Sequence, residues 1–228
     1  MLTHTAVAQS SETPGQSVPQ PGEPWDRSVP AFRHRALLGL SYGLVDVSTR
    51  VSEASVVERD DGVTFGFESG LEERFTRFFS LAARARFSTA NGERAETVGY
   101  RRSRWDFGLE PRLWVRPPRS SRIEVYLGLG SGVSLGSQTP PPRRAYEERI
   151  DGSPGYFLSA CLGGTYSWQN IALFTELGYT FHSTHFETTL EPRAPGVPRV
   201  VEDRDYVDHA LLISFGVVAG FGEFEPSN

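Results

Sequence analysis

The chain has 228 residues, a length that suits one domain with a tail. Its formal net charge is −5 and its pI is near 5.6, so the composition gives no reason to expect a nucleic-acid partner. All 23 basic residues are arginine, which excludes lysine Schiff-base chemistry and a P-loop lysine. No apolar run reaches the roughly 18 residues of a transmembrane helix, and the single cysteine, Cys161, excludes an internal disulfide.

Residues 1–31 are predicted to be a disordered, proline-rich leader. Prolines recur there among Ser, Gln, Gly and Glu, a composition that cannot bury enough apolar area to fold. Residues 6–9 read Ala-Val-Ala-Gln and match the A-x-A pattern of a signal-peptidase site. We interpret them as the residual end of an export signal.

Residues 32–221 alternate between apolar and polar side chains, and this period of two predicts strands. Around Trp105, Phe107 and Leu109, for example, the large apolar side chains share one face, whereas Arg104 and Asp106 lie on the other. Eight strands are expected, at about 33–47, 62–68, 75–88, 103–116, 122–137, 155–166, 171–182 and 206–221. We therefore predict an all-β fold, an eight-stranded antiparallel up-and-down transmembrane β-barrel.

The expected connections alternate in length. Long polar connections are predicted near 48–61, 89–102, 138–154 and 183–205, and short ones near 69–74, 117–121 and 167–170. Outer-membrane barrels have short periplasmic turns and longer extracellular loops. An outer-membrane location with both termini in the periplasm is therefore expected.

The polar face of the predicted strands favours a membrane barrel over a soluble lipocalin-like one. Gly128, Gly130 and Gly132 share that face. On a water-facing surface glycine would only weaken the strand, whereas in the crowded interior of a small barrel it leaves space for larger side chains. Pro111 lies on the apolar face inside one strand, and a bulge or an altered strand end is predicted there. Aromatic residues near strand ends are expected to form the two interfacial girdles: Trp114, Tyr156, Tyr166, Trp168, Tyr179 and Tyr206.

The pattern resembles the small eight-stranded outer-membrane barrels of the OmpA/OmpX/OmpW-like group. The resemblance covers residues 32–221 and includes Ser214–Phe221, which is similar to the C-terminal signal of such proteins: polar, then Gly216, then a final aromatic residue. Residues 222–228 follow as a short tail. The resemblance implies a monomer in a Gram-negative outer membrane, in contact with lipid and lipopolysaccharide and assembled by the barrel-assembly machinery through Ser214–Phe221. It implies no cofactor.

Nine charged residues fall on the inward face of the predicted barrel: Arg35, Glu68, Arg84, Arg86, Asp106, Glu110, Arg112, Glu124 and Glu176. Acids and bases nearly balance, and a buried charge is costly unless it is paired. We expect a lumen ionic network that fills the barrel as a plug. A narrow gated channel, in which ion pairs exchange partners, is the functional alternative.

A second constellation, His182, Thr184 and Glu187, offers an imidazole, a hydroxyl and a carboxylate. It is loosely similar to the His-x-Ser arrangement of lipid A deacylases of this fold, which makes a lipid-modifying enzyme one alternative function. A soluble lipocalin-like ligand-binding barrel is another. The preferred hypothesis is a non-enzymatic outer-membrane protein with a structural or surface-interaction role, and no metal site is predicted.

Overall fold

The computed structural model describes residues 32–51, 57–92, 101–115, 122–139, 146–152, 154–168, 170–193, 196 and 198–223. Nine strands cover most of this chain: β1 Phe32–Val51, β2 Val57–Arg74, β3 Phe79–Gly92, β4 Arg101–Val115, β5 Ile123–Thr139, β6 Tyr146–Gly152, β7 Gly155–Trp168, β8 Ile171–Pro192 and β9 Val200–Glu223. The predicted leader, the signal-like residues 6–9 and most of the predicted tail lie outside the described residues. The described residues contain no helix that is long and apolar enough to cross a membrane.

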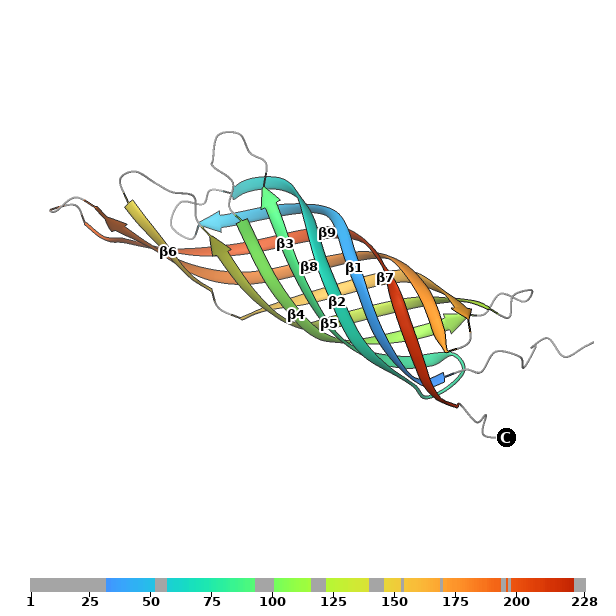
Figure 1. Ribbon diagram of the computed structural model, residues 1–228. Coiled ribbons are helices and arrows are strands. Elements are labelled where there is room, and N and C mark those ends of the chain that lie inside the picture. The colour runs from blue at the N-terminus through green and yellow to red at the C-terminus, as the bar shows by residue number, and fades with distance from the viewer. Residues whose placement is uncertain are drawn as a thin grey trace, which may run out of the picture.

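Eight of the strands form a closed ring (Figure 1). Neighbours pair antiparallel in the order β1-β2-β3-β4-β5-β7-β8-β9, and β9 pairs back onto β1. The start of β1 and the end of β9 lie at one end of the ring, which we call the turn end. The opposite end, where β6 lies, we call the extended end. The all-β up-and-down barrel predicted from the alternation is confirmed.

The extended end differs from the prediction. Residues 183–205, expected as a loop, are mostly strand: β8 runs on to Pro192 and β9 begins at Val200. The connection expected at 138–154 contains β6, which pairs with the last seven residues of β8. Three strands therefore project beyond the rest of the barrel as a sheet, seen at the left in Figure 1.

The turn end also corrects one boundary. The short turn expected at 69–74 is strand, because β2 continues to Arg74 and keeps its pairing with both neighbours, whereas the bend lies at residues 75–78. The bulge expected at Pro111 is absent. Pro111 pairs with Leu81 on β3. On the other side, the pairing of β4 with β5 skips Glu110 and Pro111 but keeps the same register before and after them.

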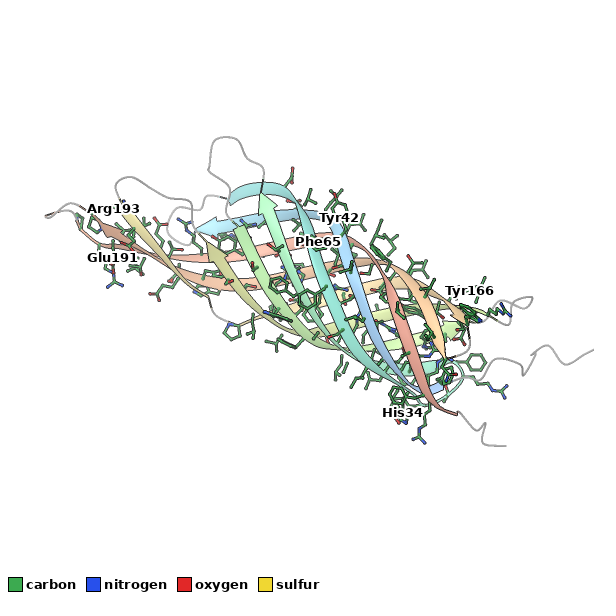
Figure 2. All side chains as sticks on the ribbon, viewed as in Figure 1. His34, Tyr42, Phe65, Tyr166, Glu191 and Arg193 are labelled. Carbon is green, nitrogen blue, oxygen red and sulfur yellow. The ribbon has the colours of Figure 1, made fainter. Side chains whose placement is uncertain are left out.

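The barrel wall between the two ends is apolar outside and polar inside. Leu38, Phe65, Leu109, Leu129 and Leu173 are among the outward side chains, and many more such side chains cover the wall (Figure 2). Water cannot favour such a surface, whereas lipid tails can. This arrangement contradicts the lipocalin-like alternative, in which the apolar face would point inward.

The polarity of the strands inverts at the extended end. Asp46 is exposed immediately beyond outward Leu44, and its neighbours Val45 and Val47 are buried inside. Beyond this level the buried interior contains the apolar cluster Val45, Val47, Phe186, Tyr206, Ala210 and Leu212, which we call the apolar cap, with buried Thr184 and Thr188 beside it on β8. The outward residues there are polar, among them His185, Glu187, Asp203 and Asp205. The lipid-facing belt therefore ends near Leu44 and the sheet above it faces water.

Aromatic residues lie on the outer wall near both margins of this belt. Toward the turn end His34 stacks on Phe221, and toward the extended end Phe67, Phe87 and Trp105 pack in a row. Tyr156, Tyr166, Trp168 and Tyr179 are exposed, as the girdle prediction requires. Trp114 and Tyr206 are corrections: both point into the lumen and are buried, because each shares the parity of a charged inward neighbour, Arg112 or Asp208.

Candidate functional site

The structure places all nine predicted lumen residues inside the barrel. Each is largely buried and each has at least one ion-pair partner within the lumen. They separate into three levels along the barrel axis, which we call the lower cluster at the turn end, the central cluster, and the upper ring below the apolar cap.

Arg84 on β3 organises the central cluster. Its Nη2 donates to Glu68 Oε2 at 2.6 Å, and its Nη1 lies 2.8 Å from Glu110 Oε2 and 3.0 Å from Glu176 Oε1. Glu68 is fully buried and also accepts from Arg86 at 2.9 Å. One guanidinium thus connects carboxylates from β2, β4 and β8 across the middle of the lumen.

A second arginine completes the central cluster. Arg112 Nε donates to Glu110 Oε1 at 2.7 Å, and its Nη1 donates to Glu72 Oε2 at 3.2 Å. The Tyr126 hydroxyl donates to Glu176 Oε2 at 2.7 Å, and the Arg112 guanidinium lies 4.5 Å from the Tyr126 ring centroid. These contacts join charged and aromatic groups from several strands across the middle of the lumen.

The lower cluster surrounds Trp114. Arg35 and Arg74 lie on the Trp114 ring, with guanidinium carbons 4.7 Å and 4.2 Å from its centroid, a cation–π arrangement. Both arginines also donate to Glu124: Arg35 Nη2 at 2.7 Å, and Arg74 through both terminal nitrogens at 3.1 Å. The Trp114 indole N–H donates to Ser80 at 2.7 Å. These contacts link side chains of β1, β2, β4 and β5 across the lumen at the turn end.

The upper ring joins four charged residues. The two ring nitrogens of His182 lie 2.8 Å from Asp208 Oδ1 and 3.0 Å from Asp106 Oδ2. Arg104 Nη1 donates to Asp208 Oδ2 at 2.5 Å, and Arg104 Nε lies 3.4 Å from Asp106 Oδ1. Ser134 also donates to Asp106, at 2.8 Å. Acidic and basic groups alternate around this ring.

A small pocket separates the upper ring from the central cluster. Arg86, Asp106, Glu110, Phe157 and Ser159 are among its lining residues. Gly108, on the inward face beside this pocket, leaves space for the Phe157 ring, because a Cβ at Gly108 would lie 2.5 Å from that ring. The glycine-rich polar face noted in the sequence therefore accommodates neighbouring side chains.

The structure does not assemble the hydrolase triad that the sequence offered as an alternative. His182 and Thr184 are buried and face inward, but Glu187 is exposed on the outer face of β8. Residues 182 and 187 differ in parity, so a straight strand sends their side chains to opposite faces. The carboxylates that contact His182 are instead Asp106 and Asp208.

Several lumen residues were missed from the sequence. Glu72 and Arg74 lay in a segment expected to be a turn, although they share the parity of Glu68, a signal that the strand continues. Arg104 was placed on the polar face of its strand but was left out of the network. Asp208 lies in the strand expected at 206–221, but only its contacts across the closed ring identify it as a lumen residue.

One trio in the described chain brings potential metal ligands together: Glu110, Cys161 and Glu176 offer ligand atoms within 4.8 Å of one another. Arg84 and Arg112 already bind the two carboxylates, and a divalent cation would have to displace these guanidiniums. The arrangement therefore favours internal ion pairs over a metal.

No protein-family model matches the chain, and no curated protein matches its sequence. The chain is similar in structure to the outer membrane protein OprG from Pseudomonas aeruginosa, with a TM-score of 0.59 and 11% identity over 85% of this chain and 97% of that chain. More distant structures include AlkL in lipid bilayers, with a TM-score of 0.46, 12% identity and full coverage of both chains. Neisserial surface protein A gives 0.44 and 12%, over 81% of this chain and 97% of that one. The likeness to OprG shows that this chain has the fold of the small outer-membrane β-barrels.

Proposed function

We propose that the protein is a structural or surface-interaction protein of the outer membrane, whose lumen is held closed by its ionic clusters. The observation that carries this proposal is the buried Arg84 guanidinium, which binds Glu68, Glu110 and Glu176 at once. Buried pairs of this kind are costly to break, because each lost partner leaves an uncompensated charge. A barrel filled in this way is a rigid support for the sheet that projects from its extended end.

The proposed orientation places the extended end outside the cell and the turn end in the periplasm. Long connections and projecting strands belong to the extracellular side of such barrels, and short turns belong to the periplasmic side. The sheet formed by β6 with the upper parts of β8 and β9 would then rise above the lipopolysaccharide headgroups. Any surface partner would meet this sheet first. Ser214–Phe221 pairs with β1 at the closing seam, a position that suits its proposed recognition by the assembly machinery.

A narrow gated channel is the second candidate. It is favoured by the way in which Arg84 Nη1 is shared, since it lies within 3.1 Å of both carboxylate oxygens of Glu110 and of Glu176. Near-equivalent partners at similar distances provide a route for exchange. Movement of this one guanidinium would open the central cluster.

Planar-bilayer recording separates the two candidates. The wild-type protein should show no steady conductance, and Glu110→Ala and Arg112→Ala should stay closed, because the remaining side chains of the central cluster still fill the cross-section. Glu187→Ala, on the outer face of the extended sheet, is the matched control. A higher conductance in either lumen variant, but not in the control, would support the channel.

A lipid-modifying activity has less support, because Glu187 faces away from His182. Mass spectrometry of lipid A from cells with and without the protein should give identical acylation. A deacylated species that appears only with the protein would contradict the non-enzymatic proposal.

A further inference from the structure

His182 occupies an unusual position for a histidine. It is 1% exposed, and both of its ring nitrogens lie within hydrogen-bond distance of a carboxylate. A neutral imidazole carries one N–H and one lone pair, whereas an imidazolium carries two N–H groups. Only the imidazolium can donate to Asp208 and Asp106 at the same time. The other nitrogen of a neutral ring would point a lone pair at an oxygen that has nothing to donate.

The charge balance of the upper ring leads to the same conclusion. Asp106 and Asp208 contribute two negative charges, and Arg104 contributes one positive charge. A protonated His182 makes the ring neutral, with acidic and basic groups in alternation. Loss of that proton leaves an unpaired carboxylate in a buried site, which is costly.

The ring also has a special place in the topology. In the eight-membered order of the barrel, β4 and β9 are four strands apart whichever way the ring is followed, so they stand on opposite sides of the lumen. The contact of Arg104 on β4 with Asp208 on β9 therefore spans the barrel. His182, on β8 next to β9, makes a second span to Asp106 on β4. Together they tie the projecting β8–β9 hairpin to the far wall.

We infer that His182 is a pH-sensitive tie that closes the extended end of the lumen when it is protonated and releases it when the proton is lost. This inference rests on the proposed closed lumen. The charged groups that face His182 are Arg104 and Asp106 from β4 and Asp208 from β9. Phe157 from β7 packs against the imidazole, and its ring carries no charge.

The direction of the effect follows from these charges. At low pH the imidazolium holds both carboxylates and the β8–β9 hairpin stays against β4. When the proton is lost at higher pH, one of the two spans is lost and repulsion between the carboxylates is no longer balanced. The upper half of the hairpin then opens more often. A metal does not suit the site, because the two carboxylates lie on opposite nitrogens of the same ring.

Two measurements on the full-length protein refolded in lipid nanodiscs test the inference. The first is ¹⁵N NMR of histidine-labelled protein at about pH 5 and about pH 8. Both ring nitrogens of His182 should carry protons at the lower pH and only one at the higher. If one nitrogen of His182 lacks a proton at about pH 5, the inference is overturned.

The second measurement is amide hydrogen exchange in β8 beyond His182. Exchange has its own pH dependence, so each rate is read as the ratio of His182→Gln to wild type. At about pH 5 the ratio should be about tenfold or more, because glutamine cannot make the charge-assisted span from the imidazolium to Asp106. At about pH 8 the ratio should approach one.

The chain supplies a matched control. His185, three positions along the same strand, also contacts two aspartates, Asp205 at 2.8 Å and Asp203 at 3.8 Å, but it is outward and exposed. His185→Gln should leave the exchange ratio near one at both pH values, and an equal effect of both variants would overturn the inference. Should His182→Gln fail to refold, Asp106→Asn removes the same span and should abolish the pH dependence. A lumen that conducts in the bilayer test would overturn the closed-lumen proposal. The NMR protonation state and the exchange ratio would still test the role of His182 independently.

Discussion

At the scale of single residues, the lumen is governed by the cost of an unpaired buried charge. Arg84 faces three carboxylates, and its side chain is only 8% exposed. By contrast, Arg33 and Glu73 form a pair of 3.3 Å whose side chains are 57% and 42% exposed. Solvent screens the second pair, and such pairs contribute little. Loss of the buried arginine should therefore cost far more than loss of the exposed one.

Arg84→Ala should lower the free energy of unfolding by about 3–5 kcal/mol, because it strands carboxylates in the lumen. Arg33→Ala should change it by less than about 1 kcal/mol. Urea unfolding of both variants refolded in lipid vesicles, followed by tryptophan fluorescence, measures the difference. Similar losses in the two variants would show that the central cluster is solvated.

At the scale of elements, the extended sheet is held by a different interior from that of the membrane-spanning wall. Phe186 and Tyr206 pack edge to face, with ring centroids 4.9 Å apart, in the apolar cap. Further along β8, Thr188 is fully buried, and its hydroxyl has no hydrogen-bond partner. An unpaired buried hydroxyl costs free energy that an isosteric methyl group does not.

Thr188→Val should therefore stabilise the extended sheet by about 1 kcal/mol, close to the lower limit for an unsatisfied buried group. Slower amide exchange in β6 and in the upper part of β8 would report this gain. Thr64→Val is the control, because the Thr64 hydroxyl donates to the carbonyl of Thr89 and its loss should destabilise β2 and β3. Faster exchange in Thr188→Val would show that its hydroxyl is satisfied by water.

At the scale of the whole molecule, the protein has two outer surfaces that meet different solvents. The wall around Leu109 is apolar, whereas the sheet that carries Val201 is bordered by acidic residues above the belt. The two side chains are similarly exposed, at 54% and 47%. Their surroundings, rather than their own exposure, assign one to lipid and the other to water.

Leu109→Arg should reduce the stability of the folded barrel in bilayers by about 2–4 kcal/mol, the cost of a cation near the midplane. Val201→Arg should be almost neutral, since it lies on the surface assigned to water. The folded fraction of each variant in vesicles, read from its gel mobility without heating, gives both values. Equal effects of the two substitutions would contradict the placement of the belt.

The sequence could predict the strands of the membrane wall because one physical constraint acts along their whole length. Lipid outside and charge inside impose strict alternation, so Trp105, Leu109 and Arg112 could each be assigned to the correct face. The same constraint identified the nine charged lumen residues. Where lipid no longer acts, the inward residues of β8 are polar at Thr184 and Thr188 but apolar at Phe186, so the alternation fades. That is why residues 183–205 resemble a loop.

By itself, the sequence determined the fold class and the face on which each charge lies, because both follow from a period of two in one strand. It left undecided which charges meet. Arg104 and Asp208 are 104 positions apart, and only closure of the ring brings them across the lumen. The height of the extended sheet and the partners of His182 were likewise decided by tertiary structure, since they depend on the register between strands.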